Sequence, residues 1–274
     1  MCALTAFQGE HGAYSEQAIF EHFGRGVETL PCESFDDVFN AVVEGKCDNG
    51  FIPVENSVAG SIHRNYDLLL QHPLVVVGEH ATRVSHCLIG LPEAKLSDIC
   101  KVISHPQALA QCERYLRSLK GVRTEPVYDT AGSVKLIQQA GDPCVAAIAS
   151  RWAAELYHMN ILVESIEDNP ANYTRFQIIA REAQPAGENA KTSIVFALKN
   201  EAGALFRAMS VFALRNIDLT KIESRPLVGK PWEYFFYIDF VGAQSDPNVQ
   251  HALANLEEFS NFLRVLGSYP RYGG

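Results

Sequence analysis

The stretch KVISHP, residues 101–106, joins a predicted strand to a predicted helix. The apolar pair Val102 and Ile103 has the character of a short buried strand, and Pro106 suits the first turn of a helix. Ser104 between them is a good N-cap residue. The same alternation of strand and helix runs from residue 1 to about residue 181. It predicts a layered α/β domain with a mostly parallel sheet.

Caps and apolar spacing mark the helices of this first domain. Ser34 and Asp37 form a capping box at the start of the first predicted helix, and Gly45 ends it. We predict helices at residues 34–44, 62–71, 106–119, 131–140 and 151–158. We predict strands at residues 4–7, 50–54, 74–77, 87–90, 102–104, 144–148, 161–163 and 176–180.

Polar residues gather where predicted strands end and helices begin. Glu55, Asn56 and Ser57 follow one strand, Ser104 follows another, and Thr130 lies at the start of a helix. In parallel sheets, ligands bind beyond the carboxyl ends of the strands. A capped helix start also directs spare N–H groups at an anion. Helix capping alone explains each residue equally well, but together they predict an anion site that needs no basic patch.

The pentapeptide NYTRF, residues 172–176, follows a turn-prone run and leads into the strand pattern 176–180. It places the hydroxyl of Thr174 beside the guanidinium of Arg175. Such a pair suits a site that hydrogen-bonds an anion and hands it a proton. Neighbouring residues of a strand point to opposite faces, so one of the two is free for a structural role.

Composition argues against several classes of partner. The net charge of −9 without a basic cluster disfavours nucleic acid and anionic membranes. No apolar run approaches the roughly 18 residues of a membrane span. The first cationic side chain is Arg25, so we expect no secretory or transit peptide in this sequence.

The seven cysteines contain no C-x-x-C pair, which predicts reduced, mostly buried thiols and a cytoplasmic location. We expect no metal, because His86 and Cys87 are adjacent rather than spaced as zinc ligands. We expect no other cofactor either, because Gly9 and Gly12 fall short of a dinucleotide fingerprint.

A second domain follows a predicted linker at residues 182–191, which is poor in apolar residues and contains Pro and Gly. The pattern after it is βαββαβ, the ferredoxin-like arrangement. The predicted strands are residues 192–198, 217–223, 234–241 and 262–266, and the predicted helices are residues 203–215 and 248–258.

Two segments of the second domain suit an amino-acid ligand. Gly203 permits close backbone approach at a helix start, which favours a carboxylate. Strand alternation puts Glu223 and Arg225 on one face and Ser224 on the other. Glu223 and Arg225 can hold both ends of a zwitterion, or they can pair with each other.

Taken in order, six short segments resemble the prephenate dehydratase family, in its monofunctional form with a C-terminal ACT domain. The resemblance spans nearly the whole chain and extends to arogenate dehydratases, especially across residues 104–112. The segments are residues 6–9, 55–57, 104–107, 129–133, 172–176 and 223–226.

The resemblance implies a two-lobed catalytic domain like a periplasmic binding protein at residues 1–181. One lobe is expected at roughly 1–80 plus 163–181 and the other at 81–162. The linker at 182–191 and an ACT regulatory domain at 192–270 follow. ACT domains commonly pair, which implies a homodimer or a homotetramer.

The resemblance also assigns residues. It implies Thr174 as the catalytic residue, and Gln111 facing the cleft together with Gln107 on the same helix. The residues implied to bind substrate are Asn56, Ser57, Ser104, Gln111, Thr130, Arg175 and Phe176. The residues implied to bind L-phenylalanine as allosteric inhibitor are Gly203, Ala204, Leu205, Asn216, Leu219, Glu223, Ser224 and Arg225. Phe206 departs from the aliphatic residue usual in the family.

The implied reaction converts prephenate to phenylpyruvate, CO2 and water in phenylalanine biosynthesis. Formation of an aromatic ring drives it, so hydrogen bonding and positioning suffice without metal, flavin or nicotinamide. The same chemistry on arogenate is the alternative, because the motifs do not separate the two substrates. A non-catalytic amino-acid-binding protein is a further alternative, and a cysteine hydrolase is disfavoured because no Cys lies in a recognisable nucleophile turn.

Overall fold

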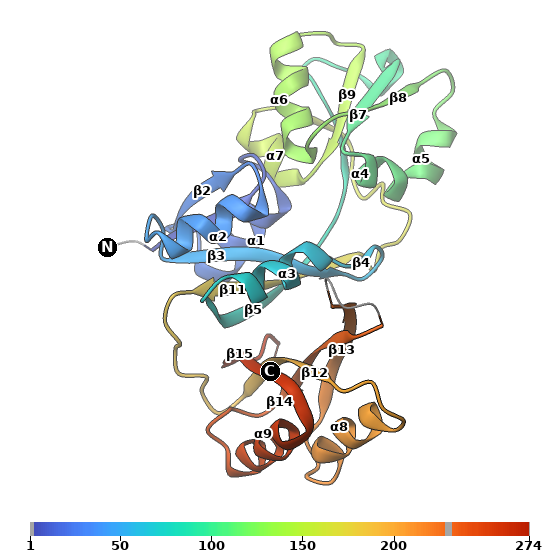
Figure 1. Ribbon diagram of the computed structural model, residues 1–274. Coiled ribbons are helices and arrows are strands. Elements are labelled where there is room, and N and C mark those ends of the chain that lie inside the picture. The colour runs from blue at the N-terminus through green and yellow to red at the C-terminus, as the bar shows by residue number, and fades with distance from the viewer. Residues whose placement is uncertain (1–2, 228–231, 274) are drawn as a thin grey trace. The chain divides into compact units, whose positions relative to one another are not determined.

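The computed structural model describes residues 3–227 and 232–273 (Figure 1). The chain divides into two compact units. The first holds the residues up to Asn65 together with His80–Phe176, and the second holds Tyr66–Glu79 together with the residues from Gln177 onward. No helix within the described ranges is both long and apolar enough to cross a membrane.

The first sheet has the strand order β2-β1-β3-β11-β5, with the short strand β4 beside β3. Strand β1 is parallel to β2 and β3, whereas β4 is antiparallel to β3. Helices α1 (Tyr14–Phe23) and α2 (Phe35–Val43) pack against β1 and β3. The strands are β1 (Leu4–Gln8), β2 (Glu28–Cys32), β3 (Asn49–Asn56), β4 (Gly60–Ser61), β5 (Val75–Arg83) and β11 (Tyr173–Ala180).

The second sheet has the order β10-β6-β9-β7-β8. Strand β7 is parallel to β8 and β9, whereas β6 is antiparallel to β9 and β10. The α/β class is confirmed, but the expectation of mostly parallel sheets is corrected to mixed sheets. The strands are β6 (Cys87–Gly90), β7 (Lys101–Ser104), β8 (Arg123–Pro126), β9 (Val145–Ala149) and β10 (Asn160–Val163). The helices are η1 (Leu96–Asp98), α4 (Pro106–Gln111), α5 (Glu113–Ser118), α6 (Thr130–Ala140) and α7 (Arg151–Leu156).

Several local predictions need correction. The helix expected at 106–119 is broken at Cys112, whose φ of −117° and ψ of 20° leave the helical region. The N-cap of α4 is His105 rather than Ser104, and that of α6 is Asp129 rather than Thr130. The sequence interpretation also missed α1, β2, β4 and β8. Strand β8 is exposed throughout, so it lacks the apolar pattern of a buried strand.

Glu16 on α1 is a buried carboxylate with four hydrogen-bond donors. The backbone N–H of Gly12 and the Nε1 of Trp152 bond to Oε2 at 2.7 and 3.0 Å, while Thr29 Oγ1 and His11 Nδ1 contact Oε1 at 2.8 and 2.7 Å. Burial alone raises the pKa of Glu16, but these hydrogen bonds outweigh it and hold the pKa below its usual value. The charged form therefore stabilises the fold above the unfolded-state pKa.

We expect Glu16→Gln to lower the free energy of unfolding by about 1–3 kcal/mol at pH 7, because the amide offers one acceptor oxygen where the carboxylate offers two. The contribution is lost as pH falls through the folded-state pKa, so the two melting temperatures should converge below about pH 4. Thermal melts across pH 3–8 test this. The exposed Glu44→Gln is the matched control, and equal stability of Glu16→Gln and the parent at pH 7 would contradict the assignment.

The second unit contains a four-stranded antiparallel sheet of order β13-β14-β12-β15. Helices α8 and α9 cover one face of it (Figure 1) and contribute Phe212, Leu253 and Leu256 to a core shared with Phe196 and Phe240. The predicted ferredoxin-like order βαββαβ is confirmed. The elements are β12 (Ala190–Leu198), α8 (Ala204–Ala213), β13 (Leu219–Pro226), β14 (Tyr234–Val241), α9 (Pro247–Phe259) and β15 (Ser260–Pro270).

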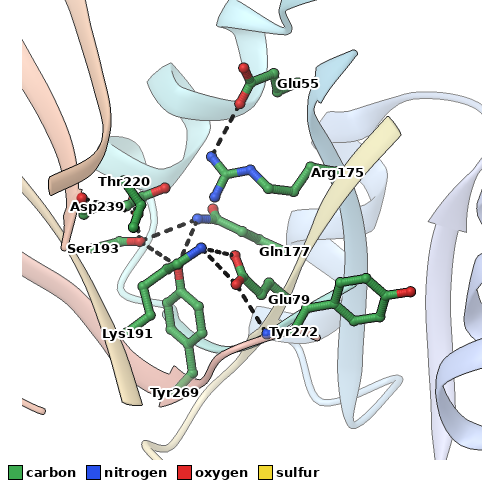
Figure 2. A network of polar contacts seen from close by, with 10 residues as sticks. All are labelled: Glu55, Glu79, Arg175, Gln177, Lys191, Ser193, Thr220, Asp239, Tyr269 and Tyr272. Carbon is green, nitrogen blue, oxygen red and sulfur yellow. Dashed lines mark hydrogen bonds and ion pairs between the residues drawn. The ribbon is translucent and has the colours of Figure 1, made fainter. Parts of the chain in front are cut away.

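The segment Tyr66–Glu79, which includes most of α3 (His63–Gln71), belongs to this second unit for clear reasons. The Arg264 guanidinium donates to four of its backbone carbonyls at 3.0–3.3 Å. Lys191 Nζ bonds both carboxylate oxygens of buried Glu79 at 2.7 and 2.8 Å (Figure 2). A Cβ at Gly267 would lie 2.0 Å from the Val76 carbonyl oxygen, so only glycine allows β15 to approach this closely.

Candidate active site

A cavity of about 550 Å³ lies in the first unit. The first turns of four helices line it, through Tyr14 of α1, Asp36 of α2, Gln107 of α4 and Thr130 of α6. Strand ends supply the rest of its polar surface. The lining residues are Gln8, Tyr14, Ser15, Ser34, Phe35, Asp36, Pro53, Asn56, Ile62, Val84, His86, His105, Gln107, Ala108, Gln111, Thr130, Thr174 and Phe176.

The positive electrostatic potential of this cavity comes from the N-termini of helices. Among the described residues that line it there is no Lys or Arg. The N-terminus of an α-helix carries about half a positive elementary charge, and α1, α2 and α6 are each nine residues or longer. Asp36 is paired with Arg64, whose Nε lies 3.3 Å from Asp36 Oδ2. This ion pair offsets the negative charge of the Asp36 carboxylate. The cavity therefore suits an anion held by N–H groups and hydroxyls.

The direction of the hydrogen bond at Thr174 follows from Asn56. The backbone N–H groups of Val58 and Ala59 donate to Asn56 Oδ1 at 3.0 and 2.8 Å, which fixes the orientation of the amide. Asn56 Nδ2 then donates to Thr174 Oγ1, which at 3.0 Å is nearer than the Tyr173 carbonyl at 3.2 Å. Within the described ranges no acceptor takes the Thr174 proton, and Thr174 lines the cavity. The Thr174 hydroxyl is thereby set to donate to a ligand.

Hydrogen-bond direction is set in the same way along a chain of buried and half-buried side chains. Asn56 Nδ2 also donates to Asn172 Oδ1 at 2.8 Å, and Asn172 Nδ2 donates to Gln111 Oε1 at 3.1 Å. His86 Nε2 lies 2.9 Å from the same Gln111 oxygen, and His86 Nδ1 lies 2.9 Å from the Tyr14 hydroxyl. Burial lowers the pKa of His86 and raises that of Tyr14, so both are neutral near pH 7.

Five of the eight residues predicted for catalysis and substrate binding line the cavity. They are Asn56, Gln111, Thr130, Thr174 and Phe176. Gln107, expected to share the face of Gln111, lines it too.

Ser57, Ser104 and Arg175 are not among the lining residues. The Ser104 hydroxyl is fully buried and donates to the Ile148 carbonyl at 2.7 Å. Ser57 Oγ donates to the Ala171 carbonyl at 2.7 Å. Arg175 pairs with Glu55 at 3.4 Å (Figure 2), as expected for a strand residue whose neighbour Thr174 faces the cavity.

The sequence interpretation did not assign His86 or Asn172 to the site. Asn172 could have been found from the sequence, because it is the first residue of the NYTRF pentapeptide. His86 had been considered only as a zinc ligand. The described residues contain no group of three or more His, Cys, Asp and Glu side chains placed to bind a metal ion.

The predicted effector residues do not share one cavity within the described part of the chain. Ala204 and Leu205 line a small cavity of about 130 Å³, and Asn216 lines a different one of about 540 Å³. Gly203 is the N-cap of α8 with a φ of +79°. On β13, Leu219, Glu223 and Arg225 are half-buried, whereas Ser224 is exposed. Arg225 Nη2 donates to Asp67 Oδ2 on α3 at 2.8 Å.

Comparison with known proteins identifies the family. The model of the prephenate dehydratase family matches residues 5–184, and that of the ACT domain matches residues 192–258. The chain belongs to the prephenate dehydratase family. Family members are carbon–oxygen lyases of aromatic amino-acid biosynthesis, so the predicted enzyme class is confirmed.

Similar proteins include a plant relative and two solved structures. Arogenate dehydratase/prephenate dehydratase 2, chloroplastic, of Arabidopsis thaliana is 49% identical over 97% of this chain and 72% of the relative. Prephenate dehydratase of Arthrobacter aurescens in complex with L-Phe has a TM-score of 0.89 at 32% identity, covering 98% of this chain and 90% of that one. A protein described as a novel type of quorum quenching acylase has a TM-score of 0.91 at 36% identity, covering 98% of both chains.

These relatives correct the predicted location. Arogenate dehydratase/prephenate dehydratases 1 and 2 of Arabidopsis thaliana are named chloroplastic, which points to a plastid rather than the cytoplasm. The prediction rested on scattered, unpaired cysteines. Such cysteines indicate a reducing compartment without saying which one.

Proposed function

We propose that the protein converts prephenate to phenylpyruvate, CO2 and water in this cavity, with arogenate as the second candidate substrate. The observation that carries the proposal is the Thr174 hydroxyl, which faces an anion-binding cavity while its oxygen accepts a hydrogen bond from Asn56. Arogenate is favoured as the second candidate because the Arabidopsis thaliana relative is named for both activities.

The reaction breaks two bonds and forms an aromatic ring. The bond between the ring and its carboxylate breaks, releasing CO2, and its electron pair enters the ring as the C–O bond to the hydroxyl breaks. The departing hydroxide takes the Thr174 proton to become water, and Thr174 recovers a proton from solvent afterwards. Water is about as weak an acid as an alcohol, so hydroxide is basic enough to accept a proton from the Thr174 hydroxyl.

The surrounding residues support that step. The Asn56 amide donates to Thr174 Oγ1 and stabilises the negative charge that develops on this oxygen. Phe176, which is 1% exposed, provides an apolar wall that disfavours the charged ring carboxylate and so promotes loss of CO2. The helix N-termini hold the second carboxylate, which keeps its charge throughout.

Product analysis tests the proposal. The purified protein is incubated with prephenate and, separately, with arogenate, each with and without L-phenylalanine, and phenylpyruvate and phenylalanine are quantified. Phenylpyruvate from prephenate supports the proposal, and faster turnover of arogenate moves the protein to the sister activity. Turnover of neither would overturn it and direct attention to acyl chemistry, the activity described for one similar structure.

We further propose that L-phenylalanine inhibits the enzyme at the ACT domain and that the enzyme is a homodimer or a homotetramer. The similar Arthrobacter aurescens structure contains L-Phe. Among the predicted effector residues, Ala204 and Leu205 line one cavity and Asn216 lines another, which favours a site completed by a second copy. Leu205, Phe206, Leu214 and Ile222 are 40–81% exposed and offer apolar surface for such pairing. Light scattering at several protein concentrations tests the assembly.

Arg225 should be required for inhibition. We expect Arg225→Lys to raise the L-phenylalanine concentration for half-inhibition at least about tenfold, because a planar guanidinium binds a carboxylate with two parallel hydrogen bonds and an ammonium does not. Asp67→Asn removes a carboxylate that Arg225 contacts but keeps the guanidinium, so its inhibition should stay closer to that of the parent. Equal inhibition of Arg225→Lys and the parent would contradict the effector assignment.

A further inference from the structure

We propose that His86 is a positioning residue: its Nε2–H holds the oxygen of the Gln111 side chain, which turns the Gln111 amide N–H groups toward the cavity to bind the substrate carboxylate that is not lost. The proposal rests on the proposed function for the identity of the ligand. The hydrogen-bond polarity on which it depends is a property of the protein alone.

The polarity begins at the backbone. The N–H groups of Val58 and Ala59 can only donate, so Asn56 Oδ1 accepts and Asn56 Nδ2 donates to Asn172 Oδ1. With its oxygen occupied in this way, Asn172 presents its Nδ2 to Gln111. The atom of Gln111 that faces Asn172 must therefore be the oxygen.

The Gln111 oxygen then sets the tautomer of His86. Two acceptors cannot bond to each other, so His86 Nε2, 2.9 Å from Gln111 Oε1, must carry the proton. In the neutral ring Nδ1 is an acceptor. The Tyr14 hydroxyl lies 2.9 Å from it and 2.8 Å from the Ser85 carbonyl, so its one proton is shared between these two acceptors. The ring is only 2% exposed and meets the Tyr14 ring edge to face, so its orientation is well fixed.

The consequence appears at the free end of Gln111. Its oxygen receives hydrogen bonds from both His86 and Asn172, whereas its Nε2 has no acceptor among the described residues. Gln111 lines the cavity, so these N–H groups are available to an anion there. Without the proton on His86 Nε2, the Gln111 oxygen keeps only the hydrogen bond from Asn172, so the amide is held less firmly and turns its oxygen toward the ligand more often, where it repels a carboxylate.

A matched pair of variants separates this role from simple packing. Gln at position 86 places an amide N–H near the position of Nε2 and can still donate to Gln111. The shorter Asn side chain of His86→Asn reaches only as far as the position of Nδ1. It can keep the hydrogen bond with Tyr14 but loses the hydrogen bond to Gln111. We expect His86→Asn to raise KM about tenfold with kcat within about threefold, and His86→Gln to keep KM within about twofold of the parent.

The effect falls on KM because the retained carboxylate carries the same charge in the ground state and the transition state. Equal KM values for the two variants, at similar melting temperatures, would overturn the positioning role. A loss confined to kcat would overturn it as well, since His86 would then act on the reacting atoms.

Nitrogen-15 NMR of the histidine side chains gives a readout that does not depend on turnover. The His86 signals are identified as those absent from His86→Gln. A neutral ring protonated at Nε2 near pH 7 is the expected result, and protonation at Nδ1 alone would overturn the proposal even in an active enzyme. If neither prephenate nor arogenate is turned over, the proposed function fails, while the NMR result still decides the polarity at His86.

Discussion

Thr174→Ala should lower kcat by at least about 100-fold, because general acid assistance to a leaving group contributes roughly 100- to 10,000-fold. The variant removes the hydroxyl that the Asn56 hydrogen bond sets to donate into the cavity. KM should change little, since the hydroxyl acts on the departing oxygen rather than on the carboxylates. Steady-state kinetics with prephenate and arogenate measure both constants.

Three further variants sharpen this test. Thr174→Ser keeps the hydroxyl and should retain part of the activity, whereas Thr174→Val keeps the shape without the hydroxyl and should be as poor as Ala. Thr124→Ala makes the same chemical change on the exposed strand β8 and should leave kcat unchanged. An Ala variant at position 174 within a few-fold of the parent, with a normal melting temperature, would remove Thr174 from the catalytic role.

The sequence predicted the fold well where local signals and tertiary structure agree. The alternating apolar runs of the first unit and the βαββαβ order of the second reflect periodicities that short segments carry by themselves. The break at Cys112 was missed because residues 106–119 read as one helix, and only the fold shows that Cys112 leaves the helical region. The membership of Tyr66–Glu79 in the second unit was missed for a similar reason, since it depends on Arg264 almost 200 residues away.

Individual site residues were harder to predict than the site. Ser104 and Thr174 are both hydroxyls at the edge of a strand, yet one is bonded to the Ile148 carbonyl and the other faces the cavity. Sequence alone does not say which acceptor a hydroxyl will meet. His86 is a stronger case, because its role depends on Gln111, 25 residues away, and its tautomer depends on amides that are farther still.

Asn56→Asp should be as damaging as the loss of Thr174, with kcat reduced at least about 100-fold, although the two side chains have nearly the same shape. The new carboxylate can still accept from the Val58 and Ala59 N–H groups, so the local turn should persist. It cannot donate to Thr174 Oγ1, and the Thr174 hydroxyl will instead donate to it. The proton that the departing hydroxide needs is then engaged elsewhere.

The same variant also tests the polarity of the whole chain of amides. A carboxylate facing Asn172 favours a flip of that amide, which in turn presents an oxygen to Gln111, so KM should rise together with the fall in kcat. Asn261→Asp on the exposed end of β15, in the second unit, adds the same charge and should leave both constants near those of the parent. If Asn56→Asp retained the parent kcat, Asn56 could not be the donor to Thr174, and the assignment of the Thr174 proton to the leaving oxygen would fail with it.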